Sequence, residues 1–325
     1  ESKCRYVYAL HPFPAGNHLR FDEHYEEDLA KLQAKFKQVI DQGVRQIAIL
    51  ADDFWNPGGQ NGLRLLNDMT EWLKEVKKEY PDMKMTIPYV PYDYMGNGSS
   101  QELQILKQAP DNVQIVMTGG RVWGEVTDNF TSTFTNNVGR GPFMWINWPC
   151  TDNSKKHLIM GGYDTFLHPG VEPSKIQGIM LNPMQQSEPS KVAIFGNASY
   201  AWNIWETKEE AEEIWNASFS FVDHNSAISN EASDALREMS KHMINQAMDS
   251  RVTALQESVV LKEQLNAFKE KLEAETLTAA DVDAMIEEFE LLQEAAKTYR
   301  ASGNEAIKEQ IVYWLDCWDD TTEAA

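Results

Sequence analysis

The sequence predicts an α/β fold with a parallel β-sheet, followed by an all-α region. Six short apolar or β-branched runs alternate with helical patterns in the first 205 residues. After Trp205 the strand pattern stops and only helical periodicity remains. A chain of 325 residues also suits two units better than one. We therefore expect two domains, residues 1–205 and residues 206–325.

The six expected strands are nearly continuous apolar runs that end in polar or aromatic residues. The strands of a parallel sheet have nearly continuous apolar sequences because they are buried on both faces. The runs cover residues 5–12, 46–53, 84–91, 113–120, 142–149 and 176–183. Parallel α/β folds place their functional residues at the carboxyl ends of the strands, so the residues that end these runs are the candidates for a site.

The segments between the strands carry helical spacing. Apolar residues recur every three or four positions after the first run and again after the second: Leu29, Leu32, Phe36 and Ile40, then Leu66, Met69, Leu73 and Val76. Such crossovers fit a doubly wound sheet or a closed (β/α)8 TIM barrel. No Gly-x-Gly-x-x-Gly or Walker motif follows the first run, which disfavours a nucleotide-binding sheet. Since a barrel has eight strands, six would correspond to strands 3 to 8 of an incomplete one.

Residues 206–325 are expected to form a helical bundle. Thr207 with Glu210, and Thr278 with Asp281, have the spacing of capping boxes at helix starts. Apolar residues recur at helical spacing in three later sets: Leu261, Leu265, Phe268 and Leu272; Met285, Phe289, Leu292 and Ala296; Ile311, Trp314, Leu315 and Trp318. This pattern fits a small antiparallel bundle, with the last set in its core.

The composition disfavours several classes of partner. The formal net charge is -21, whereas broad contact with nucleic acid or an anionic membrane needs clustered Lys and Arg. No apolar run reaches the ~18 to 20 residues of a membrane helix. The three cysteines lie far apart, and the seven histidines show no His-x-His or His-Glu-x-x-His spacing. We therefore predict no metal, no cofactor, no nucleic acid and no membrane partner.

The clearest candidates for chemistry are Asp52 and Asp53, which end the second run. At a strand end the backbone turns, so both carboxylates can face the same mouth of the sheet. One of two neighbouring acids can keep a proton while the other stays ionised, which suits acid–base work. Ordinary glycosidases hold their two acids ~5 to 10 Å apart across the scissile bond, but adjacent acids fit substrate-assisted hydrolysis by a 2-acetamido group better. The alternative is that both aspartates only begin a turn.

Other strand ends carry residues suited to binding a sugar. Trp145, Asn147 and Asp152 lie at the end of the fifth run and just after it. An indole face packs against a sugar ring, while amide and carboxylate groups bond its hydroxyls. Tyr94 follows the third run and Asn182 ends the sixth. The structural alternatives are a core role for the tryptophan and ordinary turns for Tyr94 and Asn182.

Four segments, in this order and spacing, resemble glycoside hydrolase family 84. They are residues 43–53 (GVRQIAILADD), 91–98 (PYDYMGNG), 145–152 (WINWPCTD) and 181–191 (LNPMQQSEPSK). The family contains bacterial β-N-acetylglucosaminidases, once called hyaluronidases, and nucleocytoplasmic O-GlcNAcases. The likeness runs from about residue 5 to about residue 222, and the helical region resembles the bundle that follows the barrel in bacterial members. It implies a TIM barrel and a retaining exo-β-N-acetylglucosaminidase.

By position, the resemblance also implies roles for the first three candidates. Asp52 would orient the 2-acetamido group for attack on the anomeric carbon, and Asp53 would be general acid and then general base, with an oxazoline intermediate. Tyr94 would hold the acetamido group or the intermediate. The family commonly has Pro-Thr-Asp/Glu-Tyr where this chain reads Pro91, Tyr92, Asp93 and Tyr94, so Tyr92 replaces a small residue.

The remaining candidates receive binding roles from the same resemblance. Trp145 would form a wall of the N-acetyl pocket, and Asn147 would hydrogen-bond near Asp52. Asp152 and Asn182 would bind sugar hydroxyls. The substrate class is then β-linked N-acetylglucosamine on glycans or glycoproteins.

The family's first two strands supply a glycine carbonyl and a lysine that hold the sugar, and this sequence has no match to them. We therefore expect that a separate chain could supply the missing N-terminal strands. The alternative functions are a non-catalytic glycan-binding fragment and an endo-acting hyaluronidase, which an acidic protein disfavours because hyaluronan is a polyanion. For location, we expect a secreted bacterial protein, with the cytoplasm as the alternative.

Overall fold

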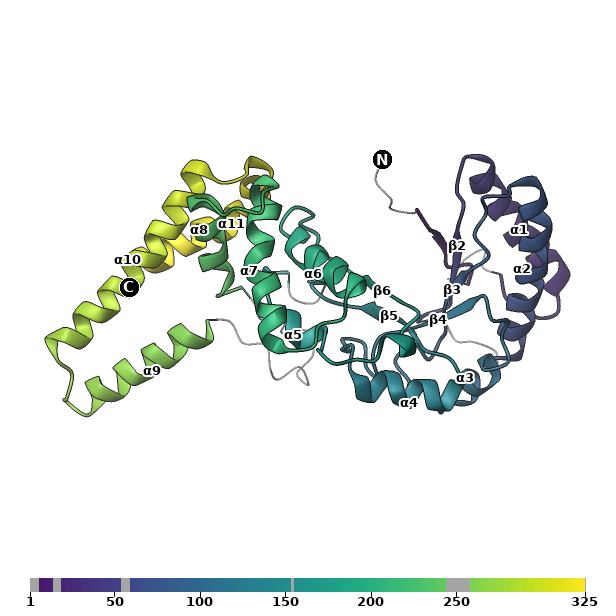
Figure 1. Cartoon of the computed structure of the whole chain (residues 1–325), viewed down its shortest axis with the longest axis horizontal. Helices are drawn as coiled ribbons and strands as arrows, with labels where there is room; N and C mark the ends of the chain where they lie inside the picture. The colour runs from purple at the N-terminus through teal and green to yellow at the C-terminus, as the bar shows by residue number, and fades with distance from the viewer. Residues whose placement is uncertain (1–5, 14–18, 54–58, 153–154, 244–257, 325) are drawn as a thin grey trace. The chain divides into compact units, whose positions relative to one another are not determined.

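The computed structural model describes residues 6–13, 19–53, 59–152, 155–243 and 258–324 (Figure 1). It confirms all six expected strands: β1 (Tyr8–Leu10), β2 (Ile47–Leu50), β3 (Ile87–Val90), β4 (Val113–Met117), β5 (Phe143–Ile146) and β6 (Gly178–Leu181). The segments between and directly after them form α1 (Tyr25–Asp41), α2 (Gln60–Glu79), α3 (Gln101–Leu106), α4 (Asp128–Val138), α5 (Tyr163–Phe166), the 3-10 turn η1 (Pro173–Lys175) and α6 (Lys191–Trp202). The rest is helical, with α7 (Lys208–His224), α8 (Glu231–Ser240), α9 (Val259–Glu273), α10 (Ala279–Ser302) and α11 (Glu305–Ala324).

The six strands form one sheet in chain order, β1 to β6. Strands β1 to β5 pair in parallel, as in the register of Tyr8 with Ile47 and of Ile87 with Val113. Every residue of β3 is buried, whereas β1 and β6 have no buried residue. The sheet is therefore an incomplete, barrel-like array whose two edge strands keep accessible side chains.

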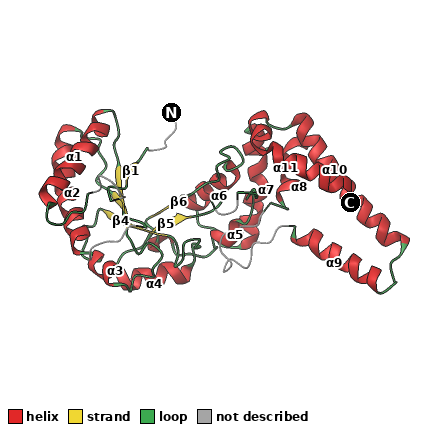
Figure 2. Ribbon diagram, turned by 180° about the vertical axis from the view of Figure 1, so that it is seen from behind, coloured by secondary structure: helices red, strands yellow, loops and turns green. Residues whose placement is uncertain are grey.

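The chain divides into two compact units. The first comprises Glu1–Trp145 and Val171–Ile179, and the second comprises Ile146–Gly170 and Met180–Ala325. In the first unit, α1 to α4 lie along one side of strands β1 to β4 (Figure 2). The expected apolar stripes hold them there, because Leu32, Phe36 and Ile40 of α1 are at most 1% exposed and Leu66, Met69 and Leu73 of α2 are fully buried.

The second unit contains a helical bundle with its own core. Phe219 of α7, Leu236 of α8, Leu292 of α10 and Leu315 of α11 are each at most 1% exposed. Thr278 and Asp281 form the expected capping box at the start of α10. At α7 the Thr207 side chain caps Glu210 as expected, but the Glu210 carboxylate accepts from Glu206 N–H instead of completing a box with Thr207.

Helix α9 differs from the prediction, because its apolar stripe is not part of the bundle core. None of its described side chains is buried, and Leu265 and Leu272 are 42% and 57% exposed. Figure 1 shows α9 beside the first half of α10, which is itself largely exposed until Leu292. An apolar stripe is buried only where another element covers it, so helical spacing predicted the helix correctly and its burial wrongly. No helix among the described residues is long and apolar enough to cross a membrane.

Candidate active site

The turn after β2 carries the two adjacent carboxylates. Strand pairing continues as far as Ala51, whose N–H donates to the Val90 carbonyl at 2.8 Å. The chain then turns, and Asp53 adopts a positive φ of 55°, a left-handed conformation that few residues other than glycine tolerate, with Asp and Asn among them. Asp52 is half-buried and Asp53 is exposed. The turn therefore gives two neighbouring acids different surroundings.

Asp52 holds a carboxylate oxygen that is ready to accept a hydrogen bond. Its Oδ1 atom is buried and accepts no hydrogen bond from any of the residues that the structure describes. A buried polar atom without a partner costs roughly 1–3 kcal/mol, so its persistence in a folded protein calls for an explanation. A ligand that donates an N–H or O–H to this oxygen would supply one.

Asp53 has a partner from the neighbouring strand. The Tyr94 hydroxyl, just beyond the end of β3, donates to Asp53 Oδ1 at 3.0 Å. Tyr94 is 8% exposed, and burial, the hydrogen bond to Asp53 and the charges of both aspartates raise its pKa to about 12. The phenol therefore stays a neutral hydrogen-bond donor throughout the physiological pH range.

The loop that carries Tyr94 is fixed from two sides. The Glu102 carboxylate of α3 accepts the N–H groups of Tyr92 and Asp93 at 3.1 and 2.9 Å. Thr118, at the end of β4, donates its N–H to the Tyr94 carbonyl at 2.9 Å. The sequence indicated Tyr94 but missed Glu102, because a helix-start glutamate is ordinary in a sequence and only the fold shows what it binds.

Trp145 lies in β5 with an alternating pattern of burial. Met144 and Ile146 are fully buried, whereas Phe143 and Trp145 keep part of their surface accessible. In a strand, alternate residues face opposite sides, so Trp145 points away from the side that covers Met144. Trp148, by contrast, is fully buried and stacks on Phe166 with ring centroids 5.4 Å apart, so it belongs to the core.

The second unit brings two other predicted residues together. Asn182 donates its side-chain amide to Asn147 Oδ1 at 3.1 Å, and its backbone N–H bonds to the Ile146 carbonyl at 2.8 Å. Both side chains are half-buried, and Asp152 in the loop after β5 is exposed. The structure thus groups Asp52, Asp53 and Tyr94 in the first unit, and Asn147 and Asn182 in the second.

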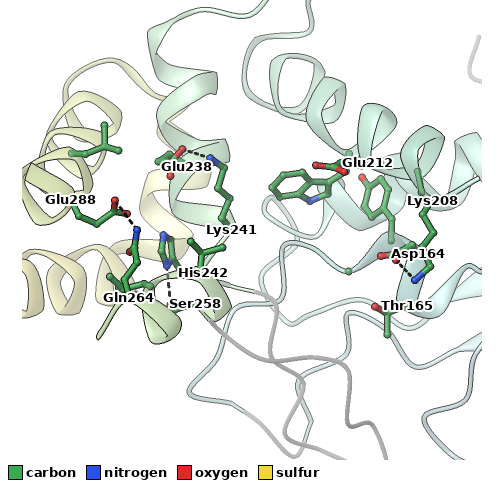
Figure 3. Close-up of a pocket in the computed structure, with 17 residues that line it drawn as sticks. Asp164, Thr165, Lys208, Glu212, Glu238, Lys241, His242, Ser258, Gln264 and Glu288 are labelled. Atoms are coloured by element: carbon green, nitrogen blue, oxygen red, sulfur yellow. Dashed lines mark hydrogen bonds and ion pairs between the residues drawn. The ribbon is translucent and has the colours of Figure 1, made fainter. Parts of the chain in front are cut away.

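Two cavities lie away from these residues. One of about 860 Å³ in the second unit is lined by α7, α8 and the start of α9 (Figure 3). Several of its polar side chains pair with one another: Lys241 with Glu238, Lys208 with Asp164, His242 with Ser258 and Gln264 with Glu288. A smaller one of about 380 Å³ in the first unit adjoins the loop after β4. None of the seven predicted site residues lines either cavity.

Among the described residues, no three His, Cys, Asp or Glu side chains gather as they would around a metal ion.

Parallel β/α units with paired carboxylates at the carboxyl end of a strand are the architecture of the barrel-type glycoside hydrolases. The chain belongs to the β-N-acetylglucosaminidase family, glycoside hydrolase family 84: the family's model matches residues 1–241. Its structure is similar to that of CpGH84D, with a TM-score of 0.83 and 29% sequence identity over 98% of this chain.

Two further solved structures share the fold at lower identity. CpGH84B is 23% identical with a TM-score of 0.79, and a mutant of the Thermobaculum terrenum O-GlcNAc hydrolase is 20% identical with a TM-score of 0.74. Each likeness covers 98% of this chain. The chain spans only 51% of CpGH84D, 54% of CpGH84B and 66% of the Thermobaculum protein.

Proposed function

We propose that this chain carries the catalytic carboxylates of a retaining exo-β-N-acetylglucosaminidase that works by substrate-assisted catalysis. The observation that carries the proposal is the contrast within the Asp52–Asp53 pair. The buried Oδ1 atom of Asp52, which has no partner among the described residues, can accept an acetamido N–H, and the exposed Asp53 can exchange a proton with a leaving group. Family membership over residues 1–241 supports the substrate class, β-linked N-acetylglucosamine on glycans or glycoproteins.

In the first step, Asp52 accepts the acetamido N–H, which makes the amide carbonyl oxygen a better nucleophile. That oxygen attacks the anomeric carbon while the glycosidic C–O bond breaks, and Asp53 gives its proton to the departing oxygen. Asp52 takes the N–H proton as the ring closes, and an oxazoline forms. In the second step, water attacks the same carbon and Asp53 takes its proton, while Asp52 returns the proton to the nitrogen and the oxazoline ring opens. Two inversions at one carbon give net retention.

The other candidates would hold the sugar. Tyr94, a neutral donor beside Asp53, would bond the acetamido group or the intermediate, and Trp145 would form a wall of the N-acetyl pocket. Asn147 would hydrogen-bond near Asp52. Asp152 and Asn182 would bind the hydroxyl groups of the sugar, as amide and carboxylate groups commonly do.

We also propose that residues 1–205 belong to a (β/α)8 barrel, followed by a helical domain over residues 206–325, and that two more strands complete the sheet. The position of β1 and β6 at the two edges of the sheet supports this, because the backbone groups of an edge strand favour pairing with another strand. We propose that a separate chain can supply these two strands.

For location, we propose a secreted bacterial protein, with the cytoplasm as the alternative.

Hydrolysis of 4-nitrophenyl β-N-acetylglucosaminide tests the function. We expect Asp53→Asn to lower kcat by about 10² to 10⁴-fold, the range that general acid–base catalysis contributes. Asp52→Asn should also lower kcat, and a substrate with an N-trifluoroacetyl group should react more slowly because its carbonyl oxygen is a weaker nucleophile. Asp22→Asn is the matched control, since Asp22 is an exposed aspartate of the same unit.

The outcomes separate the alternatives. Full activity of Asp53→Asn would contradict the assignment of the acid. Equal rates with the acetyl and trifluoroacetyl substrates would contradict substrate assistance. Folded protein that binds N-acetylglucosamine but does not cleave it, even with the N-terminal strands added as a second chain, would favour a glycan-binding fragment. Cleavage inside a hyaluronan chain would favour the endo-acting alternative.

A further inference from the structure

His11 lies at the same carboxyl edge of the sheet as the two aspartates. It is the first residue after β1, the strand that pairs with β2. Its ring nitrogen Nε2 is 2.7 Å from the backbone carbonyl oxygen of Asp52, 41 residues further along the chain. A carbonyl oxygen only accepts hydrogen bonds, so this contact requires a proton on Nε2.

The carbonyl that His11 contacts belongs to the peptide group between Asp52 and Asp53. A peptide group is planar and rigid, so fixing its oxygen fixes the orientation of the plane to which both aspartate Cα atoms belong. The adjoining φ of 55° at Asp53 is a conformation that costs a residue with a side chain about 1–2 kcal/mol. The turn therefore needs contacts from outside to hold it in this form.

The two strands that flank β2 provide these contacts. Val90 of β3 accepts the N–H of Ala51, and Tyr94, in the loop after β3, donates to the Asp53 side chain. From β1, His11 bonds the Asp52 carbonyl. The histidine thus contacts the peptide group that joins the two acids.

The imidazole ring is itself held in place. It packs edge-on against the Phe13 ring, with centroids 5.8 Å apart and planes at 81°. Phe13 is 8% exposed and packs in turn against the buried Phe21 at 5.6 Å. A half-buried histidine with an oriented ring is a better anchor than a free side chain, because less side-chain entropy is lost on forming the bond.

We propose that His11 is a positioning residue, which sets the Asp52–Asp53 peptide plane so that both carboxylates face the substrate at the same time. This inference rests on the proposed function of the two aspartates. Loss of the bond would let the plane rotate and move both acids together. A misplacement of about 1 Å at a reacting group can cost on the order of 10²-fold in rate.

Two substitutions separate the hydrogen bond from the bulk of the ring. His11→Gln keeps an N–H donor near the place of Nε2, whereas His11→Leu keeps volume and removes the donor. With 4-nitrophenyl β-N-acetylglucosaminide we expect His11→Leu to lower kcat by roughly 10 to 100-fold, with KM changed less than about threefold, and His11→Gln to recover most of the loss. His24→Leu is the matched control, since His24 is exposed in the same unit. Unchanged kcat in His11→Leu, or no recovery in His11→Gln, would overturn the proposal.

A second measurement does not depend on turnover. In NMR spectra of protein with ¹⁵N-labelled histidine, the His11 signal, assigned by its loss in His11→Gln, should show a proton on Nε2. Hydrogen exchange of the peptide covering residues 47–53 should quicken at least tenfold in His11→Leu and stay slow in His11→Gln. A bare Nε2 or unchanged exchange would overturn the role of His11. An inactive wild-type protein that passes both tests would instead count against the proposed function.

Discussion

At the scale of single residues, Asp28 shows how one buried carboxylate holds a strained loop. It is 6% exposed and lies in the first turn of α1. Its Oδ2 atom accepts the backbone N–H groups of Arg20 and Phe21 at 3.0 and 3.2 Å. Phe21 has a positive φ of 54°, yet its ring is 1% exposed. The carboxylate therefore stabilises the backbone conformation that buries this aromatic ring.

The same contacts predict a pH dependence of stability. Burial by itself would raise the pKa of Asp28, but the hydrogen bonds from Arg20, Phe21 and Lys31 outweigh it and hold the pKa below its ordinary value. A depressed folded-state pKa gives stability that is present above the unfolded-state pKa of about 3.9 and is lost as the pH falls through the folded-state value. We expect Asp28→Asn to lower the free energy of unfolding by about 1–2 kcal/mol at pH 7, and by less below pH 4.

Urea denaturation followed by circular dichroism at pH 7, 5 and 3.5 measures this difference. Asp22→Asn removes an equal charge from an exposed site nearby and should change the unfolding free energy by less than about 0.5 kcal/mol. A loss in Asp28→Asn that is the same at all three pH values would show that the charge of Asp28 is not what stabilises the loop.

At the scale of elements, the turn that carries Asp52 and Asp53 depends on neighbours that are distant in sequence. The apolar run of residues 46–51 and the two aspartates after it were enough to predict a strand that ends in acids. The anchors were not predictable, because His11 and Tyr94 are each 41 residues from their partners. Periodicity reports which face of an element is buried, and says nothing about which side chains a neighbouring strand brings to its end.

Arg140 makes a comparable link between elements. Its guanidinium donates to four backbone carbonyls at the end of α3 and the entry to β4, those of Lys107, Ala109, Pro110 and Val113. We expect Arg140→Met, which keeps much of the apolar stem, to lower the free energy of unfolding by about 1–2 kcal/mol, since partly buried carbonyls lose their donors. Arg140→Lys should recover little, because an ammonium has fewer donors and not the planar fork of a guanidinium.

Thermal and urea unfolding of both variants measure the cost. Lys78→Met is the control, because the Lys78–Glu75 ion pair is exposed and such pairs contribute about 0–1 kcal/mol. Full stability of Arg140→Met would mean that water replaces the guanidinium at these carbonyls.

At the scale of the whole molecule, the two compact units do not follow the order of the chain. The second unit takes residues Ile146–Gly170 from the middle of the sheet region, so neither unit is one continuous segment. The expected boundary at residue 205 marks where strands stop, which is a property of the local sequence. Compactness depends on contacts between distant segments, which local patterns do not contain.

Asp223 is an example of such a long-range contact in the second unit. It is 6% exposed at the end of α7, and its Oδ1 atom accepts the N–H of Asn304, 81 residues later, at 3.0 Å. The Asn304 amide donates to the Asp223 carbonyl at 2.8 Å, so α7 is tied to the junction of α10 and α11. We expect Asp223→Ala to lower the free energy of unfolding by about 1–3 kcal/mol, because the Asn304 N–H loses its acceptor in a partly buried place.

Chemical denaturation followed by tryptophan fluorescence tests this, with Asp283→Ala on the exposed face of α10 as the control. An equal effect of the two variants would mean that loss of negative charge, and not the link, changes stability in a protein with a net charge of -21.

The sequence by itself determined the six strands, most of the helices and the place of the acid pair. Each of these depends on residues that are neighbours in the chain, and apolar periodicity records them directly. Only the tertiary structure decided which residues hold that pair, that α9 keeps its apolar stripe exposed, and that Trp148 is core while Trp145 keeps accessible surface. These features depend on side chains that meet across dozens of residues, and their energies are set by burial and geometry that exist only once the chain has folded.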